Sequence, residues 1–251
     1  DRGSFDMSTA RSVELLQEQL DRFESLLVDL LEISRFDAGA AVLDTDRTDL
    51  VPMIERIIHA TEPLARRNDV KVRFAAYERP AYVECDPRRI DRVIRNLVDN
   101  AIEHANGTGV VIELAGDPSA VAVAVRDFGV GLMPGEASLA FSRFWRADKA
   151  RARTTGGTGL GLAIALEDTR LHGGWLEAAG EPGQGSCFRL TLPRITGASF
   201  TASPLPLEEG FSRAVEPGVT EQFKDQSRTE TGPGTRERDP LDTAPWRRGA
   251  P

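Results

Sequence analysis

A run of apolar side chains, spaced alternately three and four residues apart, constrains the N-terminal part of this chain more than any other feature. The spacing places these side chains on one stripe of a helix, as in the a/d seam of a coiled coil or helical bundle, and predicts one long helix over residues 8–36. Leu26 and Leu31 widen the stripe, which favours a bundle of several helices. Such a stripe is unfavourable in water, so the helix needs partners upstream of Asp1 or in a second copy of the chain. The seam consists of Val13, Leu16, Leu20, Phe23, Leu27 and Leu30.

The composition excludes several classes of protein. The chain has 251 residues, enough for one or two domains, and a net charge of −8, which argues against a nucleic-acid-binding surface and a polybasic membrane anchor. Cys85 and Cys187 lack the spacing of a disulfide framework or a zinc site. No apolar run approaches the ~18 residues of a membrane helix, and there is no signal peptide. The chain starts without a methionine, so we expect a fragment of a longer protein.

The central part of the sequence, residues 48–193, has a mixed pattern of helices and strands. Because the helices do not alternate regularly with the strands, the predicted fold class is α/β, specifically an α+β two-layer sandwich. It would have one mixed sheet with helices on one face, and the long bundle-forming helix would precede it. Helices are predicted at residues 49–66, from Asp86-Pro87 onward and at 160–171, and strands at 70–74, 82–85, 110–114, 121–126, 175–179 and 187–192.

The composition changes again after Arg194. Seven of the 15 prolines lie beyond this point, and no periodicity is visible. This pattern is typical of a disordered tail. The sequence therefore predicts three parts, namely residues 1–40, 41–195 and 196–251.

The helix opened by Asp86 carries a row of polar residues beside its apolar face. Asn96, Asn100 and His104 follow one another at intervals of four residues, which places them along one edge of the helix. Asparagine is a modest helix former, so two in one row suggest the wall of a polar cleft. Amides there suit phosphate oxygens or a hydrated Mg²⁺. A plain surface row is the alternative.

Two glycine-containing motifs follow. Asp127, Gly129 and Gly131 come directly after an alternating strand, where a carboxylate can accept a hydrogen bond from the exocyclic amine of adenine. A simple strand-to-loop turn is the alternative. Further on, residues 156–162 contain four glycines and lead into a helix, where backbone N–H groups can bind an anion. A flexible hinge is the alternative there, and the pattern is neither a Walker A loop nor a dinucleotide fingerprint.

An aromatic cluster lies between these two motifs, at residues 141–146. Phe141, Phe144 and Trp145 either fill the core or line a site. Arg146 and the basic residues that follow it could contact a phosphate tail, or could form a solvated face.

The order and spacing of these motifs resemble the N, G1, F and G2 boxes of the sensor histidine kinases. The resemblance covers residues 8–193 and places the chain in the wider superfamily that includes gyrase B, the Hsp90 chaperones and MutL. The implied fold is the Bergerat-type ATP-binding fold. Leu30-Leu31-Glu32-Ile33-Ser34-Arg35 is similar to the MtrB-type subgroup, whose response-regulator partner is MtrA.

The resemblance implies a role for each matching residue. Asn96 and Asn100 would be catalytic, Asn100 holding Mg²⁺ and Asn96 facing the phosphates of ATP. Asp127 would bind the adenine amine. Residues 8–37 would be the second helix of a dimerisation and phosphoacceptor hairpin, part of the cytoplasmic portion of a kinase that reaches the membrane only through segments upstream. The implied ATP-binding residues are Asn96, Asn100, His104, Asp127, Gly129, Gly131, Phe144, Arg146, Gly157, Thr158, Gly159, Leu160 and Gly161.

The chain departs from the family pattern in two respects. The phosphoacceptor box on the first hairpin helix is absent, and none of the three histidines has its context. Glu103 stands where many relatives carry a lysine, so that His104 or the basic residues from Arg146 onward would have to supply the positive charge.

Other functions of this superfamily remain open on the sequence. The ATP-hydrolysing relatives place a glutamate where this chain has Asn96, and a neutral amide cannot take a proton from water. The anti-sigma serine kinases also favour that glutamate and lack the heptad helix. A nucleotide sensor without enzymatic activity is a further alternative.

Overall fold

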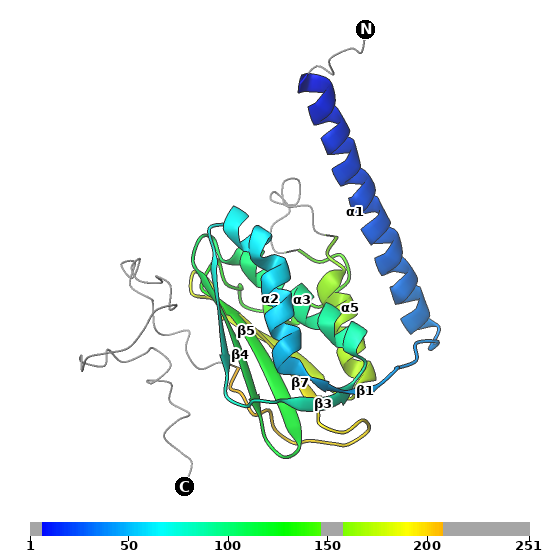
Figure 1. The fold of residues 1–251 in the computed structure, drawn as a ribbon, viewed down its shortest axis with the longest axis vertical. Coiled ribbons are helices and arrows are strands. Elements are labelled where there is room, and N and C mark those ends of the chain that lie inside the picture. Colours follow the sequence, from blue (N-terminus) through cyan, green and yellow to red (C-terminus); the bar gives the residue numbers. More distant parts are fainter. Residues whose placement is uncertain (1–6, 147–157, 208–251) are drawn as a thin grey trace, which may run out of the picture.

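The computed structural model describes residues 7–146 and 158–207. The long N-terminal helix is present, and it is followed by a sandwich of one mixed sheet and one layer of helices (Figure 1). The predicted fold class is therefore confirmed. The elements are α1 (Met7–Asp37), β1 (Asp46–Asp49), α2 (Leu50–Arg67), β2 (Lys71–Ala76), β3 (Tyr82–Cys85), α3 (Pro87–His104), β4 (Gly109–Gly116), β5 (Ala120–Asp127), α4 (Glu136–Leu139), α5 (Gly161–Leu171), β6 (Trp175–Glu181) and β7 (Gly185–Pro193).

The five-stranded sheet has the strand order β2-β4-β5-β7-β6. β2 and β4 are parallel, and the other neighbouring strands are antiparallel. β1 and β3 form a separate two-stranded sheet. Helices α2, α3 and α5 lie side by side on one face of the large sheet, and α3 contacts both of the others (Figure 1). α3 is thus the central helix of its layer.

Capping residues fix where α2 and α3 begin. The Asp86 carboxylate accepts hydrogen bonds from the backbone N–H groups of Arg88 and Arg89, and Pro87 occupies the first turn, as the sequence predicts. Asp49 caps α2 in the same way and also accepts a hydrogen bond from the N–H of Ala81, which joins α2 to the end of a neighbouring loop. In the part of the chain that the structure describes, no helix has the length and apolar character of a membrane span.

Strand β5 is buried along its whole length, on both faces of the sheet. Its valines belong to the main core beneath the helices, whereas Ala122 and Ala124 belong to a second apolar cluster with Cys187 and Leu205. Leu205 comes from residues 195–207, which we call the strap. The strap therefore covers part of the sheet face that carries no helix.

The strap corrects the predicted boundary of the disordered tail. Residues 196–207 were expected to be disordered because they show no periodicity, yet Phe200 is 8% exposed and Leu205 is 2% exposed. The strap is held by side-chain contacts and not by a ladder of backbone hydrogen bonds, which is why a search for periodicity overlooks it. Residues 208–251 lie outside the described part of the chain.

A buried histidine connects the end of α5 to the beginning of α3. His172 Nε2 accepts a hydrogen bond from the N–H of Asp86 at 3.0 Å, so the ring proton is on Nδ1, which lies 2.7 Å from the carbonyl oxygen of Asp168. Burial lowers the pKa of His172, although Asp168 and Asp86 oppose this effect. The neutral ring is thus the form that the fold requires.

We expect this histidine to make stability dependent on pH. Because the pKa is lower in the folded state than the ordinary value of 6.5, its contribution is complete above pH 6.5 and is lost as the pH falls below it. The free energy of unfolding, measured with urea between pH 7 and pH 5, should fall more steeply for the unmodified chain than for His172→Gln. Equal slopes would contradict this prediction, because the glutamine amide can accept the same hydrogen bond but does not titrate.

Candidate functional site

Asp127 is a buried carboxylate at the end of β5, with an exposure of 1%. Its Oδ1 accepts a hydrogen bond from the N–H of Gly129 at 2.9 Å, and its Oδ2 accepts one from the hydroxyl of Ser186 on β7. A carboxylate has about four acceptor positions, so capacity remains for a further donor such as an amine. Ser186 was not predicted from the sequence. The available signal was a serine directly after Gly185, at the start of a strand.

Two glycines allow the loop after β5 to pack tightly. A Cβ on Gly129 would lie 1.9 Å from the carbonyl oxygen of His104, and a Cβ on Gly131, whose φ is +69°, would lie 1.8 Å from that of Glu181. The N–H of Val130 also donates to the carbonyl oxygen of His104, at 3.3 Å. The loop thus brings Asp127 and the C-terminal end of α3 together, and we call this region the purine end after the base that the sequence predicts there.

The other end of the predicted row on α3 contacts the glycine-rich segment. The Asn96 amide donates to the carbonyl oxygen of Gly161, the first residue of α5, at 3.0 Å. A Cβ on Gly161 would lie 3.2 Å from Asn96 Oδ1, which explains the small residue there. Asn100 is half-buried, one turn further along the same row. We call the region around Asn96 and Gly161 the lid end, because the family resemblance implies that the glycine-rich segment forms a mobile lid over a triphosphate.

Helix α3 therefore joins the purine end to the lid end. Asn96 and His104 are eight residues apart, which corresponds to about 12 Å along a helix. Asn100 lies midway between them. The row thus spans the distance between the purine end and the lid end.

The glycine-rich segment is described from Thr158 onward, and Gly157 lies outside the described residues. The N–H of Phe144 donates to the carbonyl oxygen of Gly159 at 2.9 Å, and both residues have positive φ, +63° and +70°. Phe144 is 64% exposed, whereas Phe141 and Trp145 pack against the main core. The aromatic cluster thus fills the core with two side chains and places a third beside the glycine-rich segment.

Helix α1 contacts the same segment, which sequence reasoning did not predict. The Thr158 hydroxyl donates to Asp29 Oδ2 at 3.2 Å, and Leu160, 1% exposed, forms an apolar cluster with Ile33 of α1. Burial raises the pKa of Asp29, although the hydrogen bond from Thr158 opposes the shift. These contacts attach the C-terminal part of the glycine-rich segment to α1.

A second contact joins α1 to the segment around the aromatic cluster. The guanidinium of Arg143 donates two hydrogen bonds to the carboxylate of Asp37, at 2.6 and 3.0 Å. This paired geometry orients the two groups, but both side chains are largely exposed, so the pair adds little to stability.

A network of buried charges connects α1, α3 and α5. Asp168 on α5 has a side-chain exposure of 0% and binds Arg89 Nη1 at 2.8 Å and Arg92 Nη2 at 2.6 Å. Both guanidinium groups also lie 3.4 Å from Glu32 of α1. Burial alone would raise the pKa of Glu32, but the arginines outweigh it and the pKa is lowered. The carboxylate of Glu32 is therefore favoured in the charged form when α1 is docked.

The charges beside the predicted row partly compensate one another. Burial raises the pKa of Asp99, and Arg95 opposes this shift. The pKa of Glu103 is raised by partial desolvation and by repulsion from Asp99, and Arg146 opposes the shift. Arg146 therefore lies close enough to act on the position where many relatives carry a lysine.

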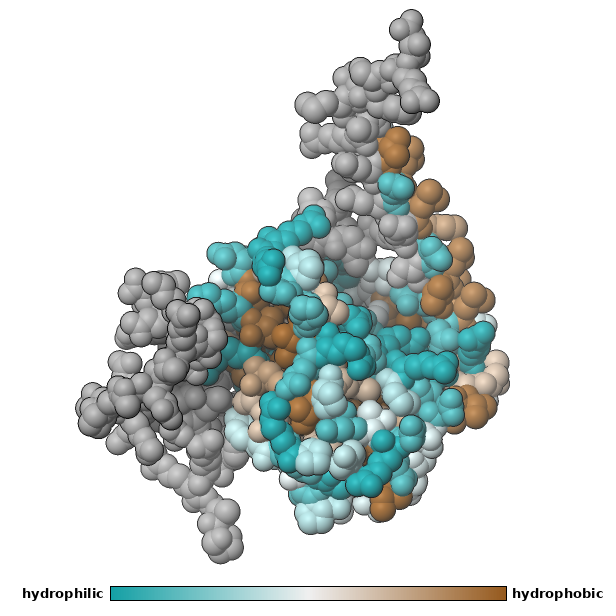
Figure 2. All heavy atoms as spheres, viewed as in Figure 1, coloured by the Kyte–Doolittle hydropathy of each residue, from teal (hydrophilic) through white to brown (hydrophobic). Residues whose placement is uncertain are grey.

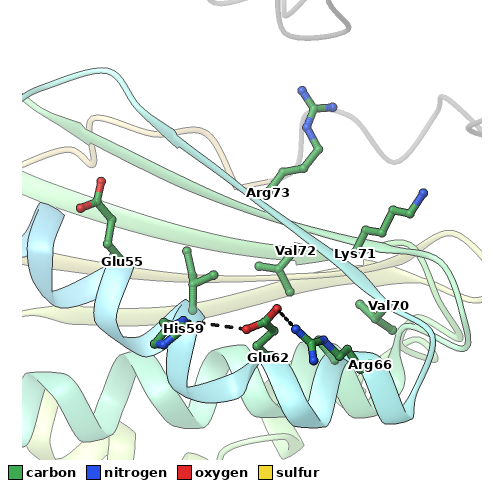
Figure 3. A pocket seen from close by; sticks show the side chains of 10 residues that line it. Glu55, His59, Glu62, Arg66, Val70, Lys71, Val72 and Arg73 are labelled. Atoms are coloured by element: carbon green, nitrogen blue, oxygen red, sulfur yellow. Dashed lines mark hydrogen bonds and ion pairs between the residues drawn. The ribbon is translucent and has the colours of Figure 1, made fainter. Parts of the chain in front are cut away.

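A hollow of ≈ 560 Å³ lies elsewhere, between α2 and the edge strand β2. Figure 3 shows His59, Glu62 and Arg66 along α2, with Glu62 between the other two, and Val72 on the facing strand. None of the predicted nucleotide-binding residues lines this hollow. It is therefore separate from the site along α3.

Comparison with known proteins places this arrangement in a family. Residues 85–196 match the family described as histidine kinase-, DNA gyrase B-, and HSP90-like ATPase. The chain is 53% identical over 203 residues to the sensor histidine kinase MtrB of Mycolicibacterium paratuberculosis and 51% identical to MtrB of Mycobacterium tuberculosis. Each alignment covers 81% of this chain and 36% of the relative, so the chain spans about a third of the length of these proteins.

Solved structures agree with this assignment. The full-length kinase ShkA, crystallised with AMPPNP, superposes with a TM-score of 0.67 and 25% identity, over 78% of this chain and 41% of ShkA. The mycobacterial sensor histidine kinase MprB gives a TM-score of 0.51 and 28% identity, over 61% of this chain and 99% of the MprB chain. This chain therefore belongs to the sensor histidine kinases, and its residues 85–196 form their ATPase-type domain.

Proposed function

We propose that the chain binds Mg·ATP along α3 and donates the γ-phosphoryl group to a histidine on a phosphoacceptor helix, from which it passes to an aspartate of a response regulator. The observation that carries this proposal is the placement of a buried carboxylate at one end of α3 and of a glycine-rich segment at the other. The carboxylate can accept a hydrogen bond from the amine of adenine, and the backbone N–H groups of the glycine-rich segment can bind the triphosphate. By the similarity to MtrB, the response regulator would be MtrA-like.

The residues along α3 have the chemistry to hold the nucleotide and its metal. Asp127 would accept the adenine amine, with Gly129 and Gly131 leaving room for the base, and Asn96 would face the phosphates. In the described part of the chain, no group of three or more acidic, histidine or cysteine side chains is placed to hold a metal. A single amide ligand such as Asn100 nevertheless fits Mg²⁺, which keeps several waters and binds phosphate oxygens.

The remaining predicted residues would enclose the triphosphate. His104 ends the row on α3, and Phe144 and Arg146 lie on the segment of the aromatic cluster. Gly157, Thr158, Gly159, Leu160 and Gly161 form the proposed lid. The burial of Leu160 against α1 supports an anchor for the lid at its C-terminal side. Positioning and charge neutralisation are the main requirements of phosphoryl transfer, so the absence of a general base at Asn96 favours a kinase over a hydrolase.

The apolar seam of α1 supports a dimer. Its side chains remain exposed in the isolated chain, among them Leu16 at 64% and Leu20 at 66%, and they follow one edge of the helix (Figure 2). We propose that α1 is the second helix of a dimerisation hairpin and that these side chains pack in a four-helix bundle with a second copy. By the same similarity, the chain would be the cytoplasmic portion of a kinase that reaches the membrane through segments outside this sequence.

The test of this function is phosphoryl transfer in trans. We expect γ-labelled ATP and Mg²⁺ to give no label on the chain alone, because it lacks the phosphoacceptor box, and an acid-labile label on a separately added phosphoacceptor hairpin from an MtrB-type kinase. Asn100→Ala is the matched control and should abolish the transfer. Label on the chain alone, or release of phosphate with no label on the hairpin, would contradict the proposal.

A further inference from the structure

The strap contacts several strands, among them β3 through Thr196, β6 through Phe200 and β7 through Ser203 and Leu205. The Ser203 hydroxyl lies 2.8 Å from the hydroxyl of Thr191, and the Arg189 guanidinium donates to the carbonyl oxygen of Leu205. Leu205 itself belongs to the apolar cluster that includes Cys187. Cys187, Arg189 and Thr191 are alternate residues, so the strap follows one face of β7 over five residues.

The same strand provides a donor to the purine end. Ser186 directly precedes Cys187, and its hydroxyl donates to Asp127. Gly185 packs against the backbone of Asp127, since a Cβ on Gly185 would lie 2.1 Å from the Asp127 carbonyl oxygen. Successive side chains of a strand point to opposite faces. The strap therefore packs on the face of β7 that carries Cys187. The neighbouring residue, Ser186, points to the opposite face, where its hydroxyl contacts the proposed purine-binding carboxylate of Asp127.

Near the start of β7, Phe188 packs into the main core on the helix face, and the strap packs on the opposite face. Gly180 lies near the end of β6, Gly183 lies in the turn and Gly185 begins β7, and the latter two have positive φ. Cys187 is 0% exposed and belongs to the same apolar cluster as Ala122, Ala124 and Leu205. Packing of Leu205 on this cluster thus fixes the strand immediately after a glycine-rich turn.

We propose that the strap is a positioning element for the nucleotide site, with Leu205 as its central residue. By covering the open face of β5 and β7, it holds Ser186 and Gly185 against Asp127 and so maintains the geometry that reads the amine of adenine. Pro204 and Pro206 flank Leu205 and restrict the backbone there, which lowers the entropy lost when the strap docks. This inference rests on the proposed function, because it assigns the purine to Asp127.

The experiment measures nucleotide selectivity in the full chain. ADP and inosine diphosphate differ at the position of the adenine amine, so their ratio of affinities reports on the purine end and not on overall stability. For Leu205→Ala, we expect calorimetry to show ADP binding weakened by about three- to tenfold, the order found for residues that act on a site indirectly. Binding of inosine diphosphate should stay within twofold, and Leu205→Met should restore the ratio.

Two further variants separate positioning from loss of stability. Ile57 is fully buried on α2, which carries none of the proposed nucleotide residues, so Ile57→Ala should lower the melting temperature without changing the selectivity. Ser203→Ala removes only the hydroxyl contact and should shift the selectivity in the same direction as Leu205→Ala, which keeps the test decisive if Leu205→Ala does not fold.

The outcomes distinguish the inference from the function on which it rests. If the strap variants keep the ADP selectivity of the unmodified chain, the positioning role is wrong. It is also wrong if Ile57→Ala lowers this selectivity as much as Leu205→Ala does. If the unmodified chain binds neither diphosphate, the proposed function itself fails.

Discussion

Asp127→Asn should weaken the binding of ATP and ADP by about 10- to 150-fold, because a hydrogen bond to a charged group contributes about 1.5–3 kcal/mol. Asp127 is 1% exposed and retains acceptor capacity after its bonds to Ser186 and Gly129. The asparagine replaces one acceptor oxygen by an NH₂ group, which cannot accept a hydrogen bond from the amine of adenine. The Ser186 hydroxyl can rotate to accept from this NH₂ group, so the fold should be retained.

Calorimetry with ADP measures this effect, and the melting temperature shows that the variant is folded. Asp69→Asn is a matched control, because Asp69 is exposed and its positive φ of 54° is tolerated by asparagine. Its affinity should equal that of the unmodified chain. An Asp127→Asn variant that binds ADP as tightly as the unmodified chain would overturn the assignment of the purine end.

Asp168→Asn should lower the free energy of unfolding by about 3 kcal/mol, near the lower end of the range for a broken buried ion pair. Asp168 is fully buried and is the shared partner of Arg89 and Arg92, so its loss leaves two neighbouring guanidinium groups with Glu32 as their main counter-charge. The lower end applies because the Arg92 side chain is 30% exposed and water can screen part of its charge. Urea unfolding at pH 7 measures the change.

Glu167→Gln, one residue earlier on the same helix, is the control for this prediction. Glu167 pairs with Arg170 at 2.8 Å, but the two side chains are 33% and 61% exposed, so the loss should be below about 1 kcal/mol. Similar losses of unfolding free energy for the two variants would show that the burial of Asp168 does not account for the predicted loss.

The long-range contacts of the site could not be predicted from sequence. Asp127 and Ser186 are 59 residues apart, and Thr158 and Asp29 are 129 apart. Each contact forms because the sheet order and the docking of α1 bring distant segments together. No local preference of the chain encodes either pairing, which explains why sequence reasoning identified Asp127 and Thr158 but not their partners.

Sequence alone determined those features of this protein that depend on local chemistry. The alternating spacing of apolar residues fixed α1, Asp86-Pro87 fixed the start of α3, and the order of the asparagine, aspartate and glycine motifs identified the family. These features repeat with the period of a helix or strand, or lie within a few residues of one another, so they are visible without the fold.

The tertiary structure decided what covers each surface. Alternation of valine and alanine in β5 shows that its two faces differ, but not that Ala122 and Ala124 lie beneath Leu205, about 80 residues further along the chain. Likewise, Glu32 and Asp168 act as one charged network only because α1 docks on α3 and α5. Such contacts depend on closing long loops and on the shape of the surfaces that meet, which a one-dimensional pattern does not contain.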